Sequence, residues 1–312
     1  MTTRYPGPIT EPRVFDHRIA ESGLVTDEAL AELLDRYPVE LFDINLYDYD
    51  DEGQVSLRTG ARGKSSGADL LEAIQKGRLW VNLRAVEQGC PAMWAEVMKA
   101  FDPIKAAYPR LNPTTLSGQL ILSSPKARVP YHFDPAGVVL FHMRGRKRLW
   151  VYPGDEAHLP ERSMELVVMR QTTEEIPYSQ AFDADAQVVD LEPGQALTWP
   201  LYAPHRVENL SAFCVSLSMD FQTWGSRFRN GALFTHGALR ARGLKPGATD
   251  RLSTPGGALG RVGGAQTDRR GQEPVDGFRA QLRTGRQGRR WSRDGSRLTW
   301  VWPGPAPACE FE

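Results

Sequence analysis

Residues 128–152 read RVPYHFDPAGVVLFHMRGRKRLWVY, and the fold assignment starts from this stretch. Its two apolar runs, 137–143 and 146–152, are separated by Arg144-Gly145, a pair typical of a tight turn. Runs of this length that are rich in Val, Leu and aromatic residues favour β-strands. We interpret the two runs as a β-hairpin, which makes this stretch part of an antiparallel sheet.

Similar short apolar runs lie on both sides of this stretch, and turns that contain Pro or Gly separate them. They are residues 117–123, 188–199, 205–210 and 213–221. Several short strands at this spacing are typical of an antiparallel sandwich or barrel. The region 113–224 is therefore predicted to be an all-β core.

The first 112 residues show helical patterns instead. Helices are predicted at 27–37, with Thr26 as the N-cap, at 68–76 and at 91–107, and a strand at 78–86. The predicted fold class is mainly β with flanking α, divided into a helical N-terminal part (1–112), the β core (113–224) and a C-terminal extension (225–312).

Composition limits the class of protein. The 312 residues are 41% hydrophobic and 24% charged, which excludes a wholly disordered or collagen-like chain. The formal net charge is zero, so the chain as a whole is not a basic nucleic-acid binder. Three separated cysteines and the lack of a long apolar segment predict a cytoplasmic protein without a disulfide scaffold or a membrane helix.

The extension is strongly basic from about residue 240. Residues 240–300 contain thirteen Arg and one Lys against four Asp and one Glu, a net charge of +9, together with twelve Gly. Large apolar side chains are too sparse there to offset the entropy of ordering, so we expect a flexible tail. The apolar segment 298–302 is a candidate strand that docks back onto the protein.

The chemistry is predicted from His132-Phe133-Asp134. On a strand, His132 and Asp134 point to the same face because side chains alternate. His205 begins another predicted strand, and two imidazoles with one carboxylate form a facial triad that favours Fe(II), although Zn or Mn also fits chemically. His142 and His158 are weaker alternative ligands, and no catalytic residue beyond the ligands is predicted.

An open Fe(II) site that activates O2 needs an electron source, and 2-oxoglutarate is one that chelates the metal. The second carboxylate of this co-substrate needs a cation inside the barrel. Lys147 supplies it if its side chain faces inward with Leu149 and Val151, while Arg146 and Arg148 face outward. The alternative is that these cations form a solvated basic hairpin.

These motifs, together with 204–209 (PHRVEN) and 216–221 (SLSMDF), resemble the jumonji-C and cupin-like Fe(II)/2-oxoglutarate oxygenases. The similarity covers about residues 78–224 and is greatest to the branch of the factor-inhibiting-HIF asparaginyl hydroxylase. It implies a double-stranded β-helix (jelly-roll), iron held by His132, Asp134 and His205, and Lys147 as the anchor of the co-substrate.

The chain departs from the family pattern at three positions. Val129 replaces a hydroxyl residue that helps to bind the co-substrate, Asp220 stands where relatives have Asn, and Gly137 replaces a polar residue of the asparaginyl-hydroxylase branch. Ser216 and Ser218 are predicted to contact the co-substrate, and either of them or Ser123 could supply the missing hydroxyl. Tyr131 and Tyr202 flank the ligands and are predicted to line the mouth of the site. Other aromatic residues of the strands are expected in the core.

Three functions remain open from the sequence. The first is hydroxylation of a protein or peptide side chain by Fe(II), 2-oxoglutarate and O2, and the second is the same chemistry on a small metabolite. The third is a non-catalytic cupin-like sensor whose basic tail binds nucleic acid. No membrane partner is predicted, and oligomerisation is left open.

Overall fold

The computed structural model describes residues 4–5, 7–49, 55–60, 63–210 and 212–247. The strands are β1 (Arg13–Asp16), β2 (Phe42–Tyr49), β3 (Val55–Gly60), β4 (Leu79–Arg84), β5 (Thr115–Ser123), β6 (Arg128–His132), β7 (Gly137–Arg144), β8 (Lys147–Val151), β9 (Gln187–Leu191), β10 (Gln195–Thr198), β11 (His205–Asn209) and β12 (Cys214–Gln222). The α-helices are α1 (Asp27–Arg36), α2 (Gly67–Lys76), α3 (Val86–Gly89), α4 (Pro91–Ala107), α5 (Glu161–Val168) and α6 (Trp224–Arg240). Short 3-10 turns occur at Ile19–Ser22, Val39–Leu41 and Gln180–Asp185.

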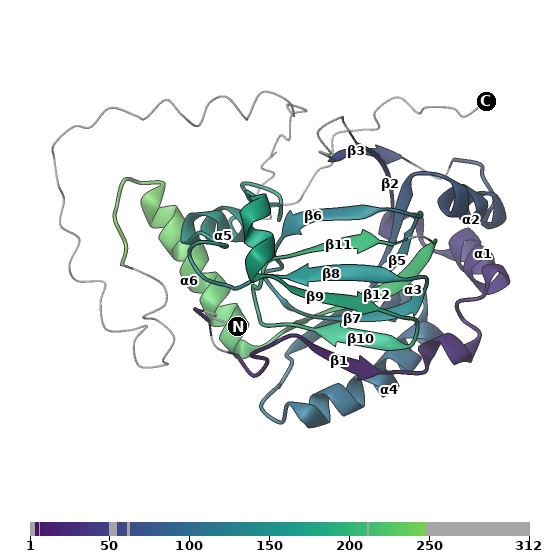
Figure 1. Ribbon diagram of the computed structural model, residues 1–312, viewed down its shortest axis with the longest axis horizontal. Helices are drawn as coiled ribbons and strands as arrows, with labels where there is room; N and C mark the ends of the chain where they lie inside the picture. The colour runs from purple at the N-terminus through teal and green to yellow at the C-terminus, as the bar shows by residue number, and fades with distance from the viewer. Residues whose placement is uncertain (1–3, 6, 50–54, 61–62, 211, 248–312) are drawn as a thin grey trace, which may run out of the picture. The chain divides into compact units, whose positions relative to one another are not determined.

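Two antiparallel sheets face each other in the described part of the chain (Figure 1). One has eight strands in the order β1-β10-β7-β12-β5-β4-β2-β3, and the other has four in the order β6-β11-β8-β9. The crossing of the chain between two such sheets is the jelly-roll arrangement, so the predicted fold class is confirmed. We call the interior between the two sheets, which side chains of one apolar cluster largely fill, the lumen.

Strand β7 shows how the two layers of the core form. Its side chains alternate between the lumen, where Val138 and Leu140 lie, and the opposite face, where Val139, Phe141 and Met143 pack in the same cluster as residues of α1, α2 and α4. A strand covered on both faces is apolar throughout rather than alternating. This explains why 137–143 has no polar face apart from His142.

The predicted N-terminal helices are confirmed. The Thr26 side chain accepts a hydrogen bond from the Ala29 amide at the start of α1, and α4 covers the predicted residues 91–107. Helix α2 begins with a capping box between Ser66 and Asp69. Such caps satisfy amide groups that have no partner within the helix.

Two details of the strand prediction are wrong. Strands β7 and β8 do not form a hairpin, because β7 pairs with β10 and β12 while β8 pairs with β9 and β11 of the other sheet. Gly145 is therefore the point where the chain crosses between the sheets. The predicted strand 188–199 is likewise two strands, β9 and β10, in different sheets, with a turn at Gly194.

Strands β1 to β4 come from the first 112 residues and extend the same sheet that contains β5, β7 and β12. The division at 112 and 224 stays a prediction, and the expected tail beyond residue 247, including 298–302, lies outside the described residues. Cys90 and Cys214 are buried free thiols. Among the described residues, no helix has the length and hydropathy needed to cross a membrane.

Replacement of Gly145 by Ala tests the crossing. Gly145 has φ +81°, and an added Cβ would lie 2.6 Å from both Cys214 Sγ and the Phe213 carbonyl oxygen. We expect Gly145→Ala to lower the free energy of unfolding by about 2–4 kcal/mol, from backbone strain and overpacking together. The control is Gly243→Ala, where φ is +78° but no atom lies within 4 Å, so strain alone costs about 1 kcal/mol. Both unfolding free energies are measured by urea denaturation. Equal losses in the two variants would contradict the close approach of the chain at Gly145.

Candidate metal centre

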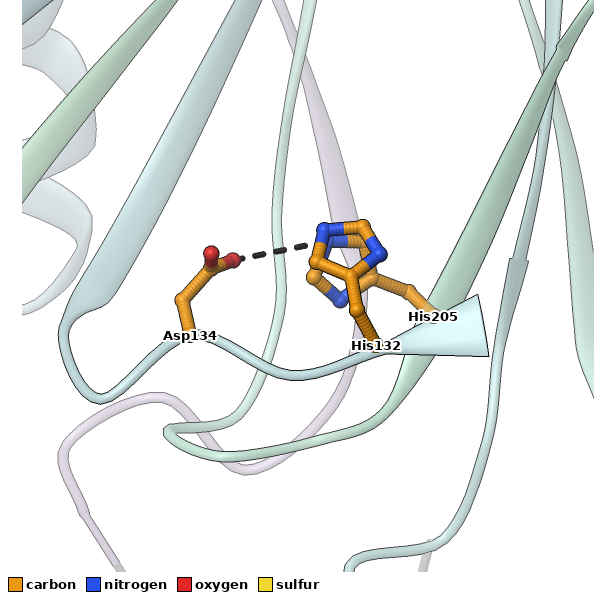
Figure 2. A group of neighbouring side chains, drawn as sticks. All are labelled: His132, Asp134 and His205. Carbon is orange, nitrogen blue, oxygen red and sulfur yellow. Dashed lines mark ion pairs between the residues drawn. The ribbon is translucent and has the colours of Figure 1, made fainter. Parts of the chain in front are cut away.

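Three potential ligands meet at one end of the lumen (Figure 2). His132 is the last residue of β6, Asp134 follows on the next loop, and His205 is the first residue of β11. One ligand atom from each of these side chains lies within 4.8 Å of the other two. The pairing of β6 with β11 places His205 directly opposite His132, which explains how residues 73 positions apart come together.

Backbone carbonyl groups orient both imidazoles. His132 Nδ1 lies 2.8 Å from the Pro130 carbonyl oxygen, and His205 Nδ1 lies 3.2 Å from that of Ala203. A carbonyl oxygen only accepts, so each Nδ1 carries a proton and Nε2 is the ring atom left to bind a metal. His205 Nε2 lies 3.4 Å from Asp134 Oδ2. Fixing the tautomer in this way is typical of metal-binding histidines.

The electrostatics of the site also favour a cation. Burial, and then the neighbouring His132, lower the pKa of His205 well below its usual value, so its imidazole is neutral. Burial raises the pKa of Asp134, an effect that His132 opposes. A divalent ion would reverse the cost of ionising Asp134, because a carboxylate bound to a cation is stabilised in its charged form.

Lys147 lies on the lumen face, as its predicted alternation requires. Lys147, Leu149 and Val151 are 4%, 0% and 0% exposed, whereas Arg148 and Trp150 between them are partly exposed. Val151 is paired opposite His205 and Lys147 opposite Asn209. Lys147 is therefore four residues, or about 13 Å along the strand, from the level of the triad.

The three neighbouring arginines differ from Lys147 in having acidic partners. Arg144 pairs with Asp27, Arg146 with Glu192 and Arg148 with Asp190, all on the outer surface. For Lys147, no hydrogen bond or ion pair of the amine is found within the part of the chain that the structure describes. Burial lowers its pKa, which the nearby Cys214 thiol partly opposes. The alternative of a solvated basic hairpin is wrong for this residue.

His142 and Ser216 form a buried pair beside Lys147. His142 Nε2 lies 3.0 Å from the Gly145 carbonyl oxygen and must carry a proton to bond with it. Burial and the charge of Lys147 lower the pKa of His142 to about 3, so the ring is neutral and its Nδ1 accepts from Ser216 Oγ at 2.9 Å. The Ser216 hydroxyl proton is thus already used, and Ser216 can offer a ligand only its lone pairs. His142 lies apart from the triad and is not one of its ligands.

Acidic side chains surround the mouth of the lumen near Asp134. Ser218 Oγ donates to Asp220 Oδ1 at 3.2 Å, so its contact with a co-substrate stays a prediction. The pKa of Asp220 is raised to about 7, first because surrounding protein reduces its hydration and then because Asp134 and Glu174 are nearby anions. Asp220 therefore takes up a proton readily, which relieves the repulsion expected from a second carboxylate here.

Tyr131 and Tyr202 do not line the mouth as the sequence suggested. They are 3% and 2% exposed and belong to a hydrophobic cluster outside the lumen. The Tyr131 hydroxyl donates to the His158 carbonyl oxygen at 2.9 Å, and that of Tyr202 to Asn230 Oδ1 at 2.7 Å. Tyr131 is the strand neighbour of His132, so alternation along β6 turns its ring to the opposite face, and Tyr202 lies in the turn before β11.

Sequence reasoning missed two neighbours of the triad. The Trp199 ring lies 4.6 Å from the His205 ring between centroids, and it joins the apolar cluster of the lumen as well. Glu174 comes from a loop whose backbone pairs with the end of β6, since its carbonyl oxygen accepts from the Phe133 amide. The position of this loop depends on tertiary contacts, and no local motif announces it.

The Asn209 side chain, at the end of β11, is buried and engaged in hydrogen bonds. Its side-chain amide donates to Ser123 Oγ at 2.9 Å and to the Ser124 carbonyl oxygen at 2.8 Å. Ser123 Oγ therefore accepts a bond from Asn209. The bonds also tie β11 to the end of β5 in the other sheet, near Lys147.

A second group of potential ligands consists of Glu161, Glu165 and His236 between α5 and α6. Arg240 donates to both carboxylates, and Arg162 also donates to Glu165. These arginines already neutralise the acidic pair. The group therefore acts as an ionic link between the two helices.

Replacement of Asp220 by Asn tests the acidic mouth through the pH dependence of stability. An unfolded Asp has a pKa near 4, whereas that of folded Asp220 is about 7. Between these values the folded state holds more protons, so stability falls as pH rises through this window. With a chelator present to remove metal ions, we expect Asp220→Asn to melt a few degrees above the wild type at pH 8, where Asp220 is ionised. At pH 4 the two melting temperatures should match. A pH-independent difference would contradict the raised pKa.

Comparisons with known proteins agree with this architecture. Residues 61–224, just over half of the chain, match the family described as a cupin-like domain. A search among curated proteins found no match.

Among solved structures, the ribosomal oxygenase YcfD of Escherichia coli matches with 17% identity over 74% of this chain and a TM-score of 0.45. Its complex with cobalt and 2-oxoglutarate matches with 14% identity over 85% of this chain and a TM-score of 0.43. This chain spans 53% and 59% of the length of those two chains.

The predicted similarity to the asparaginyl-hydroxylase branch is not tested by these comparisons and stays a prediction. The wider resemblance, to cupin-like proteins with a jelly-roll fold, is confirmed by the two sheets and by the family match over residues 61–224. This chain belongs to the cupin-like domain family.

Proposed function

We propose that the protein is an Fe(II)- and 2-oxoglutarate-dependent oxygenase that hydroxylates a side chain of a protein or peptide. One observation carries the proposal. A single lumen has a His-Asp-His cluster at its open end and, deeper inside, a buried lysine for which the described residues provide no anion. A metal ion held by the cluster, together with a ligand that has two acidic groups, would bind the metal at one end and neutralise Lys147 at the other.

The donor set fits Fe(II). With Nδ1 bonded to a backbone carbonyl, His132 and His205 can each offer Nε2 to a metal, and Asp134 adds a negative charge. Two ligands bonded at about 2.1 Å and at right angles lie about 3 Å apart, and His205 Nε2 is 3.4 Å from Asp134 Oδ2. Two imidazoles and one carboxylate on one side leave the remaining positions of a six-coordinate ion open.

The lumen fits 2-oxoglutarate in charge and in polarity. Leu140, Leu149, Val151 and Val207 form an apolar lining between Lys147 and the triad, which suits the methylene groups of the co-substrate. A carboxylate beside Lys147 would provide the buried ammonium group with the ion pair it lacks, and such pairs are strong when hydrogen-bonded. Neutral His142 adds no positive charge that could compete with Lys147.

Fe(II) held by the triad would supply, with 2-oxoglutarate and O2, the oxidation that inserts one oxygen atom into a substrate C–H bond, with release of succinate and CO2. The residues of the chain have distinct tasks in this reaction. His132, Asp134 and His205 hold the ion, Lys147 orients the co-substrate, and the apolar lining keeps water from the space between them. Trp199 packs against His205 and limits the freedom of its ring.

A protein or peptide substrate is supported by the exposed acidic residues near the triad. Asp220 and Glu174 reach solvent close to Asp134, and a side chain projecting from a protein or peptide would approach the triad past them. The buried free thiols Cys90 and Cys214 are compatible with a reducing compartment such as the cytoplasm.

Replacement of Lys147 by Ala tests the proposal. Removing one partner of a buried charge pair usually costs 2 kcal/mol or more, so we expect the 2-oxoglutarate concentration for half-maximal succinate formation to rise at least tenfold. Fe(II) affinity should stay unchanged in the same variant, whereas His132→Ala should lose it. Succinate formation from 2-oxoglutarate under air and equilibrium binding of Fe(II) measure the two effects.

Arg148→Ala is the matched control, because Arg148 is the next residue of β8 and pairs with Asp190 on the outer surface. Its requirement for 2-oxoglutarate should equal that of the wild type. Lys147→Ala should also be at least as heat-stable as the wild type without metal, because the lost ammonium group is buried without a described partner. An unchanged requirement in a folded Lys147→Ala protein would refute the assignment of the pocket.

A further inference from the structure

A separate cavity of about 380 Å³ opens next to the triad and plays no part in holding the metal or the co-substrate. Three aromatic side chains, Trp199, Phe221 and Trp224, contribute to its wall, together with Arg110 and Arg229. None of its lining residues is acidic, in contrast to the mouth around Asp134. Its volume lies within the range of small-ligand pockets.

One aromatic residue connects this cavity with the candidate metal centre. Trp199 lines the cavity and also packs against His205, at 4.6 Å between ring centroids. Gly137, three residues after Asp134, lines the cavity too. A group bound in the cavity therefore lies one side chain away from a proposed ligand of the iron.

Gly137 is what makes room for the aromatic wall. An added Cβ at Gly137 would collide with the Phe221 ring, so this ring packs directly on the bare backbone. Gly137 is one of the positions where the sequence departs from the asparaginyl-hydroxylase branch, which has a polar side chain there. In this chain the position serves the cavity instead.

Helix α6 couples the cavity to the loop that carries Asp134. Its first turn lines the cavity through Trp224, and farther along the helix Asn230 Nδ2 donates to the Pro135 carbonyl oxygen at 2.7 Å. Gln222, just before the helix, donates to the same oxygen at 2.9 Å. A ligand that contacts this end of α6 thus touches the element that fixes the residue next to Asp134.

The lining defines the chemistry of the ligand. Flat aromatic walls favour an apolar, aromatic group, and guanidinium groups favour a carboxylate at its edge. Arg110 is exposed, and no acidic partner for it is found among the residues that the structure describes. The Arg229 guanidinium lies 5.8 Å from the centre of the Tyr5 ring, which holds it at the side of the cavity.

We propose that this cavity is a substrate subsite that takes an aromatic side chain with a carboxylate beside it, next to the atom to be hydroxylated. The proposal rests on the proposed function and narrows its substrate class. The carboxylate could belong to an acidic residue of a peptide or to a free aromatic acid, and the two sources are distinguished by experiment.

Binding of a fluorescein-labelled twelve-residue peptide with a central Phe-Asp in a Gly/Ser background tests the subsite. Anisotropy is recorded on the whole protein with a chelator, and again with Fe(II) and 2-oxoglutarate under nitrogen. We expect saturable binding that a Phe-Lys peptide does not reproduce. N-acetyl-phenylalanine should compete better than its amide, and stronger competition by the free acid than by unlabelled peptide would identify a small molecule as the source.

The variants Trp224→Ala and Arg110→Gln change exposed side chains, so both should fold. Trp224→Ala should weaken binding about tenfold, as loss of an aromatic anchor does, and Arg110→Gln should weaken it several-fold and reduce its salt dependence. Phe234→Ala is the control, because Phe234 is 52% exposed on the same helix but does not line the cavity.

Absence of binding by both the peptide and the free acid, equal competition by acid and amide, or equal losses in Trp224→Ala and Phe234→Ala would overturn the proposal. These outcomes differ from failure of the proposed function. A protein that binds Fe(II) and forms succinate, but ignores the peptide and the acid, loses only the subsite.

Discussion

The register of β11 is the constraint on which the site depends. This strand lies between β6 and β8, and it places His205 opposite both His132 and Val151, and Asn209 opposite Lys147. A shift of one residue would turn His205, Val207 and Asn209 away from the lumen. One strand therefore sets the position of the metal ligands and their distance from the buried lysine.

The lumen has different properties along its length. At its deeper end, Lys147 is a buried cation beside a histidine that burial keeps neutral. At the open end, burial and then the nearby Asp134 carboxylate raise the pKa of Glu174 and that of Asp220. Beyond them the cavity beside α6 carries arginines and no acids. In the proposed function, the protein thus offers a cationic group to the co-substrate, an anionic group to the metal, and a second cationic region outside. This order gives the two kinds of acid, the co-substrate and the proposed substrate carboxylate, separate places.

Local patterns in the sequence predicted what depends on local geometry. Alternation along 146–152 placed Lys147 inside and Arg148 outside, and helical spacing with a Thr cap located α1. The triad could be proposed because His132 and Asp134 are close in sequence. Its third member, His205, could be proposed because it begins another predicted strand, but the pairing of β11 with β6 that brings it to His132 is visible only in the structure.

The errors arise where position depends on the whole fold. Gly145 has the sequence of a hairpin turn, but a jelly-roll uses the same glycine to cross between sheets, and nothing local distinguishes the two. Tyr131 and Tyr202 are near ligands in sequence, yet both rings pack in another cluster. Alternation along β6 turns Tyr131 away from His132, and Tyr202 lies in a turn with φ +65°. Glu174 approaches the triad from a loop about forty residues away in sequence, so no spacing rule could find it.

The central claim is that one lumen holds Fe(II) and 2-oxoglutarate together, and spectroscopy under nitrogen tests it most directly. Fe(II) is added to the protein first and 2-oxoglutarate second, and the visible spectrum is recorded after each addition. The structure predicts a weak charge-transfer band of the chelated keto acid, which appears only when both are present and saturates at one equivalent of 2-oxoglutarate. Bound iron without such a band at any concentration of 2-oxoglutarate would contradict the claim.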